Sequence, residues 1–290
     1  MAVIVGVHGI AQQFQGGYQL GSIWFDCIRD GLAIAGHRAT AAKLEPAEVA
    51  VAFFGDLFRP QGAMAALDPP YTPEDIRPGP EQETLEAFYN AATALDPALG
   101  TPAEAMGAGR ATVKVMLDRL MRSASFSTVI QRAFIGNLKQ VTAFLCDPMV
   151  KENVLARVHE QTGPDTRVLI GHSLGSVVAY EYLCRYAPEQ VDLLLTLGSP
   201  LGIPHVVFDR LTPAPVRGAG AWPGSVATWV NVADPDDVVA LRKDLSPLFP
   251  GRSRHQVIRD RQVDNGDAPH AVDRYLNSRE SGGAVGDILG

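Results

Sequence analysis

The sequence predicts an α/β fold: a mostly parallel sheet of about six strands with helices on both faces. Short segments that are apolar throughout alternate with longer segments of helical periodicity, as expected for strands buried between two layers of helices. Several apolar segments end at a glycine, where a strand would give way to a loop. About a hundred residues of helix and loop separate the second and third apolar segments, which is too many for one crossover and predicts an insertion.

Six segments have the length and composition of buried strands. They are Ala2–Val7, Val49–Phe54, Val168–Gly171, Val191–Leu197, Val226–Val232 and His255–Val263. Seven segments follow the helical period, and Gly36 is the expected end of the first. They are Leu20–Ala35, Glu81–Leu95, Thr112–Arg122, Phe126–Leu145, Met149–Gln161, Val177–Leu183 and Ala271–Arg279.

The order of these segments divides the chain. Residues 1–58 and 150–280 are expected to form the α/β core. Residues 59–149 begin with prolines and glycines and continue with amphipathic helices. They are expected to form a helical cap over the carboxyl edge of the sheet, where open α/β sheets bind ligands. Residues 281–290 contain several glycines and are expected to be a flexible tail.

The composition is that of a globular protein able to bury a large core, with 46% hydrophobic and 20% charged residues among 290. The net charge of −7 argues against a nucleic-acid partner. Cys27, Cys146 and Cys184 lack the spacing of a disulfide framework or a zinc site and are expected to be buried, reduced thiols. No transmembrane segment or signal peptide is apparent, so we expect a cytoplasmic location.

The third apolar segment leads into a Gly-x-Ser-x-Gly pattern, Gly171-His172-Ser173-Leu174-Gly175, and a helical segment follows at once. Strand, sharp turn and helix are the context of a nucleophile elbow, where the serine has a strained backbone and its neighbours must be small. We therefore predict Ser173 as a catalytic nucleophile, supported by Gly171 and Gly175. His172, inside the turn, is expected to be structural.

A serine hydroxyl needs a base and an orienting acid. In this topology the acid comes next along the chain and the histidine last, each just after a strand. Of the later histidines, His205 comes too early, and His255 begins the last strand at the end of the sheet away from Ser173. His270 follows the last strand and is the predicted base.

Three aspartates, Asp234, Asp236 and Asp237, follow the fifth strand. Asp237 precedes Val238-Val239, which could anchor a partly buried carboxylate, and it is the predicted acid. Asp234 is the alternative. The aspartates that are not the acid are expected to form turns or caps.

Two backbone amides should bind the oxyanion of the transition state. One is the amide of Leu174, at the start of the helix after the elbow. The other should come from the loop after the first strand, where we choose Ile10. Gly9 would let this backbone approach the substrate, and His8 is expected to hydrogen-bond within the loop.

Taken together, these residues resemble the α/β-hydrolase superfamily, and within it the lipases and esterases. The matching motifs are His8-Gly9, Gly171–Gly175, Thr196–Pro200, Asp237-Val238-Val239 and His270 before Tyr275-Leu276. The resemblance covers the first and last thirds of the chain and implies an α/β-hydrolase fold with a cap insertion. One difference is Ala240, at a position where lipase acid segments often carry proline.

The implied chemistry is hydrolysis of a carboxylic ester through an acyl-enzyme, without a metal or a cofactor. The expected substrate is a small-molecule or lipid acyl ester. The cap helices Thr112–Arg122 and Phe126–Leu145 could offer apolar surface to an acyl chain, and Lys114, Arg119 and Arg122 could attract an anionic head group or permit transient membrane contact. For each helix alone, packing on the rest of the protein is the favoured interpretation.

Two other functions stay open. The same triad would serve an acyl-thioesterase or an acyltransferase. A protein of this fold could also work by binding alone, although an intact serine, histidine and oxyanion loop argue against it. The sequence does not indicate an oligomeric state.

Overall fold

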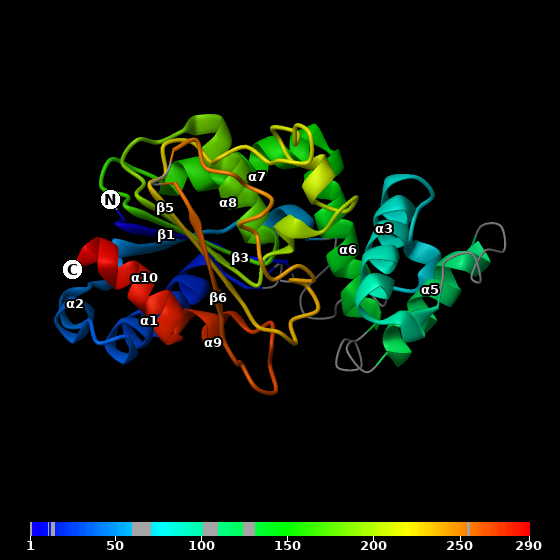
Figure 1. Ribbon diagram of the computed structural model, residues 1–290, viewed down its shortest axis with the longest axis horizontal. Helices are drawn as coiled ribbons and strands as arrows, with labels where there is room; N and C mark the ends of the chain where they lie inside the picture. Colours follow the sequence, from blue (N-terminus) through cyan, green and yellow to red (C-terminus); the bar gives the residue numbers. More distant parts are fainter. Residues whose placement is uncertain are drawn as a thin grey trace.

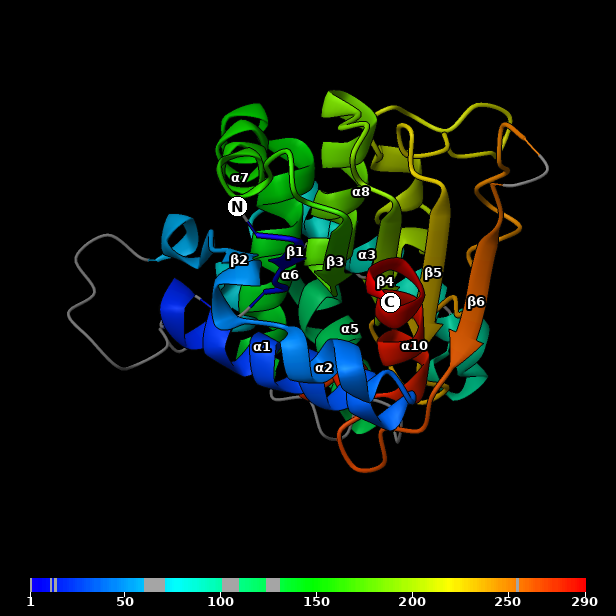
Figure 2. The ribbon, with the colours of Figure 1, turned by 90° about the vertical axis from the view of Figure 1, so that its left-hand side faces the viewer.

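The structure, a computed structural model, describes residues 2–10, 12, 15–59, 71–100, 110–123, 131–253 and 256–290. At its centre lies a six-stranded sheet with the order β2-β1-β3-β4-β5-β6, in which all neighbouring strands are parallel (Figure 2). The strands are β1 (Ile4–Val7), β2 (Val49–Ala52), β3 (Val168–His172), β4 (Leu193–Leu197), β5 (Thr228–Ala233) and β6 (Ile258–Gln262). The predicted α/β sheet is confirmed, and His255, the first residue expected in its last strand, lies outside the described residues.

Helices cover both faces of this sheet (Figures 1 and 2). On one face lie α1 (Gly17–Ile34), α2 (Arg38–Lys43), α9 (Val272–Leu276) and α10 (Arg279–Leu289); on the other lie α7 (Pro148–Gln161) and α8 (Leu174–Tyr186). Each layer buries its own apolar cluster against the sheet. The contact of α1 with β1 depends on Gly6, because a Cβ there would collide with the indole of Trp24.

Three helices stand beyond the carboxyl ends of the strands: α3 (Pro80–Leu95), α5 (Arg110–Arg122) and α6 (Gln131–Cys146) (Figure 1). They share a third apolar cluster, and Val238 and Leu241 of the loop after β5 pack against it. The apolar side of α5 therefore packs on neighbouring helices, as favoured from its sequence. Residues 126–130, expected to begin the helix before α7, lie outside the described residues.

The prediction that residues 281–290 are a flexible tail is wrong. They belong to α10, whose first turn is capped by Ser278, since its side-chain oxygen accepts a hydrogen bond from the amide of Ser281. α10 lies directly against α1, and a Cβ on Gly282 would collide with the backbone of Gly31. The glycines that suggested disorder are needed here because two helices meet backbone to backbone.

The three cysteines are unpaired, as predicted, but they are not all buried. Cys146 is exposed, while Cys27 and Cys184 are half-buried. Burial raises the pKa of Cys27 to about 11 and that of Cys184 to about 12, so both thiols stay protonated at neutral pH.

Two adjacent glycines of α10 test its packing against α1. Gly282→Ala is expected to lower the free energy of unfolding by about 1–3 kcal/mol, because the methyl group forces the helices apart. Gly283→Ala should instead be neutral or raise it by up to about 1 kcal/mol, since nothing lies within 4 Å of a Cβ there and alanine favours a helix. Urea denaturation followed by circular dichroism measures both; equal effects would contradict the packing.

Candidate active site

The turn between β3 and α8 consists of one residue, Ser173. Its backbone has φ 55° and ψ −130°, a conformation that non-glycine residues rarely adopt. The amide of Ser173 donates a hydrogen bond of 3.0 Å to the carbonyl of Leu197 on β4. The sheet itself thus holds the strained serine at the carboxyl end of its strands.

The residues around this turn are packed too closely for larger side chains. A Cβ on Gly171 would lie 2.5 Å from the Cα of Ser176, and one on Gly175 would collide with the carbonyl of Val7. The hydroxyl of Ser176 donates to the carbonyl of Ser173 at 2.6 Å, which fixes the turn from the helix side. Gly171 and Gly175 therefore have the supporting positions expected of them.

His270 and Asp237, far apart in sequence, meet beside the elbow. His270 Nδ1 lies 2.8 Å from Asp237 Oδ2, and the carboxylate is fully buried. The same oxygen accepts a second hydrogen bond, from the hydroxyl of Tyr275 at 2.8 Å. The other oxygen accepts from the amides of Val239 at 2.8 Å and Ala240 at 3.4 Å. Four donors thus hold one carboxylate in a single orientation.

These donors decide the charge of the carboxylate. Burial alone would raise the pKa of Asp237, but the neighbouring His270 and the hydrogen bonds from His270, Tyr275 and Val239 hold it below its ordinary value. Asp237 is therefore ionised at neutral pH and can orient an imidazole.

The other two aspartates of the loop after β5 have different surroundings. Asp234 is buried, and its carboxylate accepts hydrogen bonds from the amides of Asp236 and Asn265. Its own amide donates to the hydroxyl of Tyr275 at 2.9 Å. Asp234 thus joins the loops after β5 and β6, whereas Asp236 is exposed. Of the three aspartates, only Asp237 contacts His270.

The loop after β1 lies against the serine, since a Cβ on Gly9 would be 2.7 Å from the Cβ of Ser173. His8 Nε2 accepts a hydrogen bond of 3.0 Å from the amide of Phe54, so the proton of the neutral ring is on Nδ1, which donates to the carbonyl of Gly9 at 2.6 Å. Burial lowers the pKa of His8 to about 4 and keeps the ring neutral. His8 thus has the predicted role within the loop.

His172 is the second buried histidine of the site. Its Nε2 lies 3.0 Å from the backbone carbonyl of His270, and the two ring centroids are 4.7 Å apart. Burial, with a further contribution from His270, lowers the pKa of His172 to about 3. Its ring is therefore neutral across the physiological pH range.

A cavity of about 870 Å³ opens above the elbow. Ser173 and His270 both line it, together with Ile10 and Leu174. Most of its wall is apolar and comes from α3, α6 and the loops after β4 and β5. These lining residues include Phe88, Ala92, Phe134, Leu138, Val141, Ile203, Val206, Val207, Val238 and Leu241.

The lining of the cavity distinguishes α6 from α5, two helices for which the sequence favoured the same interpretation. α6 contributes Phe134, Leu138 and Val141, so packing within the protein is not its only role. No described side chain of α5 lines the cavity. Arg119 of α5 instead donates hydrogen bonds to the hydroxyl of Tyr89 and to a backbone carbonyl.

Sequence reasoning missed two side chains of the site. Tyr275 was noted only as part of a motif, and its contact with Asp237 depends on how α9 packs. Lys243 Nζ donates to the backbone carbonyl of Asp237 at 2.6 Å, and burial lowers its pKa. A lysine in a loop carries no sequence signal for such a contact, because its partner is a backbone atom.

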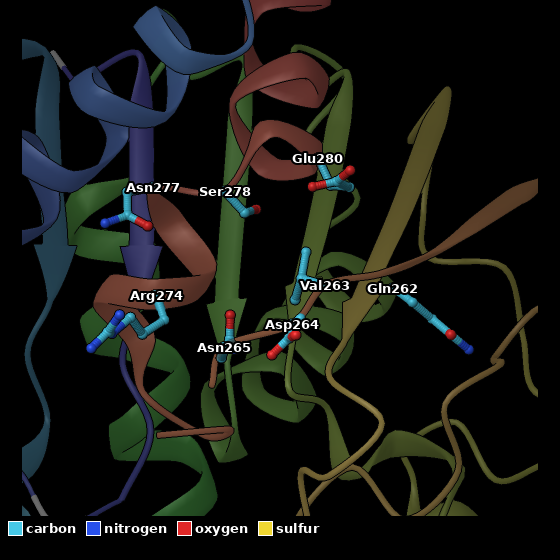
Figure 3. A pocket seen from close by; sticks show the side chains of 8 residues that line it. All are labelled: Gln262, Val263, Asp264, Asn265, Arg274, Asn277, Ser278 and Glu280. Carbon is cyan, nitrogen blue, oxygen red and sulfur yellow. The ribbon is translucent and has the colours of Figure 1, made fainter. Parts of the chain in front are cut away.

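A second hollow, of about 360 Å³, lies near the end of β6 (Figure 3). Its polar wall includes Asp264, Arg274 and Glu280, and its one hydroxyl side chain, Ser278, caps α10. The lining residues include no histidine that could act as a base. The cavity beside Ser173 is therefore the candidate active site.

The parallel sheet and the one-residue turn between β3 and α8 are consistent with an α/β-hydrolase fold, as the resemblance implied. Residues 133–214, from α6 to the loop after β4, match the family model of the PGAP1-like alpha/beta domain, a family in the α/β-hydrolase superfamily. The match includes Ser173 and indicates a hydrolase-like function. Searches of the curated proteins and of the solved structures give no match. Within the described part of the chain, no helix is long and apolar enough to cross a bilayer.

The two buried histidines predict how stability depends on pH. Their pKa values of about 4 and about 3 in the folded protein lie below the value of roughly 6.5 in an unfolded chain, so near pH 5 only the unfolded chain binds these protons. Their contribution to stability is full above about pH 6.5 and is lost as the pH falls toward the folded values.

Each histidine should add about 1.4 kcal/mol per pH unit to the slope of the unfolding free energy in this range. Removing His172 by His172→Gln should therefore reduce the slope between pH 6 and pH 5 by this amount and leave the slope above pH 7.5 unchanged. Urea denaturation at these pH values measures it. If the unfolding free energies of variant and wild type depended on pH in the same way, the lowered pKa of His172 would be contradicted.

Proposed function

We propose that the protein is a serine hydrolase that cleaves carboxylic esters with an apolar acyl group, through Ser173, His270 and Asp237. The observation that carries the proposal is the contact between His270 Nδ1 and Asp237, at a cavity that the strained Ser173 also lines. A structural ion pair has no need of a neighbouring serine in a left-handed turn. Along the chain the nucleophile comes first, the acid second and the base last, which is the order that this fold class uses.

Each residue has a defined step in the reaction. Because Nδ1 of His270 is bonded to Asp237, Nε2 is the nitrogen that takes the proton of Ser173 as its oxygen attacks the ester carbonyl. The ionised Asp237 stabilises the imidazolium that results. His270 then donates this proton to the leaving alcohol, and the acyl group stays on Ser173. Water, deprotonated by His270, releases the acid and restores the serine.

The backbone amides of Ile10 and Leu174 are proposed to stabilise the oxyanion. Leu174 is the first residue of α8, so its amide has no partner within the helix. In a trans peptide the carbonyl and the following amide point in opposite directions. His8 binds the carbonyl of Gly9, and this bond supports an orientation of the Ile10 amide away from His8.

The cavity supports an acyl chain as the bound group. Its volume of about 870 Å³ lies within the range of pockets that bind small molecules, roughly 300–1,000 Å³. Aromatic rings from two helices, Phe88 of α3 and Phe134 of α6, stand 5.3 Å apart on its wall. We propose that residues 59–149 act as a cap that supplies this apolar wall to the core formed by 1–58 and 150–280.

The nucleophile and the acid can be tested together. Ser173→Ala should abolish labelling by a fluorophosphonate probe, and Ser173→Ala and Asp237→Asn should each lower kcat on p-nitrophenyl esters by roughly 10³-fold or more. Asp234→Asn is the matched control and should cost less than about 10-fold, since Asp234 does not contact His270. A folded wild-type protein that the probe does not label would contradict the proposal. Loss of activity in Asp234→Asn but not in Asp237→Asn would contradict the choice of Asp237 as the acid.

A second test concerns the acyl group. Phe134→Ala should widen the cavity and move the preference toward longer or bulkier acyl chains, changing the ratio of kcat/KM for long and short p-nitrophenyl esters by roughly 10-fold or more. The control is Leu117→Ala on α5. Leu117 is buried in the third apolar cluster and does not line the cavity, so this change should lower stability and leave the ratio unchanged. An unchanged ratio in Phe134→Ala would exclude this wall from acyl binding. Acyl-CoA thioesters, assayed alongside, distinguish an esterase from a thioesterase.

A further inference from the structure

The base of the proposed triad lies on a loop rather than on a helix or strand. Residues 263–271 join β6 to α9, and most of them are half-buried or exposed. Asn265 anchors the loop through its amide, bonded to Asp234, and through its side chain, which donates to the carbonyl of Pro269 at 3.0 Å. At the base itself, the imidazole of His270 contacts Asp237, and the backbone carbonyl of His270 accepts a hydrogen bond of 3.0 Å from His172 Nε2.

His172 differs from Asn265 in its position: Asn265 belongs to the loop, whereas His172 belongs to the central sheet. It is the last residue of β3, paired with Leu197 of the central sheet, and it directly precedes Ser173. Its side chain therefore connects the strand that carries the nucleophile to the backbone of the residue that carries the base. A carbonyl can only accept, so Nε2 of His172 carries the proton and donates it.

The ring of His172 also limits how His270 can rotate. The two rings lie at 35° with centroids 4.7 Å apart, and Tyr275 packs near the same ring, with centroids 6.0 Å apart. Because His172 is neutral, it adds no positive charge beside His270 when that residue accepts a proton. A protonated neighbour at this distance would oppose the reaction.

We propose that His172 is a positioning residue that fixes the distance between Ser173 and His270 by holding the backbone of the base to the nucleophile strand. The inference rests on the proposed function, because a positioning role has meaning only if these residues react. Displacements of about 1 Å in a reacting pair can cost on the order of 10²-fold in rate. A loosened His270 loop should therefore lower kcat while substrate binding in the apolar cavity persists.

Three variants of His172 distinguish the effect of the hydrogen-bond donor at Nε2 from the effect of the volume of the ring. In His172→Gln the amide nitrogen can reach the position of Nε2, in His172→Asn it stops short, and in His172→Phe the ring remains without a donor. We expect His172→Asn and His172→Phe to lower kcat on a p-nitrophenyl ester by roughly 10- to 100-fold with KM within about 3-fold. His172→Gln should keep kcat within about 5-fold of wild type. His159 of α7 packs on Tyr186 and is not among the residues that line the cavity, so His159→Phe should leave kcat unchanged.

Thermal unfolding of each variant is measured in parallel. Gln and Asn are similar in polarity and size, so a purely structural role predicts equal losses of kcat in these two variants, and that result would overturn the proposal. An unchanged kcat in His172→Asn would do the same, even if His172→Phe does not fold. If wild type hydrolyses esters and the variants fail to differ, the positioning role alone is wrong. If wild type neither hydrolyses esters nor reacts with a fluorophosphonate, the proposed function fails and takes this inference with it.

Discussion

The backbone of Ser173 is the constraint on which the rest of the site depends. A single residue must reverse the chain from β3 into α8, and it does so in a left-handed conformation that costs on the order of 1–3 kcal/mol. The turn is tolerated because the surrounding backbone leaves no alternative: Gly171 and Gly175 let the helix and the loop after β1 come into direct contact with it. The strain is thus balanced by the packing of the central sheet.

Around this rigid point the other groups are held by hydrogen bonds rather than by packing alone. The carboxylate of Asp237 accepts from four donors, and Tyr275 and Asp234 connect its loop to the loop that carries His270. Buried polar groups of this kind are stable only when each is satisfied. The same network therefore both orients the carboxylate of Asp237 and ties together the ends of β5 and β6.

Sequence patterns predicted the parts of this arrangement that depend on local chemistry. The strands and the elbow follow from apolar periodicity and from the turn that a Gly-x-Ser-x-Gly segment makes. The choice of Asp237 and His270 follows from the chain order expected for this topology, in which each comes just after a strand. Contacts made by tertiary packing could not be predicted: Tyr275 on Asp237, Lys243 on a backbone carbonyl, and α10 against α1. The glycines of α10 suggest disorder when only the sequence is considered. In the structure, the small size of glycine instead permits close packing of α10 against α1.

The distribution of the site along the chain affects when it can form during synthesis. The elbow is complete once α8 has been made, but His270 and Tyr275 follow Ser173 by about a hundred residues. At translation rates of roughly 5–20 residues per second, this delay is on the order of 5–20 seconds. With the proposed roles, a nascent chain would expose its nucleophile well before it acquired a base, so the growing polypeptide could not hydrolyse esters in the meantime. Chemistry would begin only after folding had brought the C-terminal segments onto the sheet.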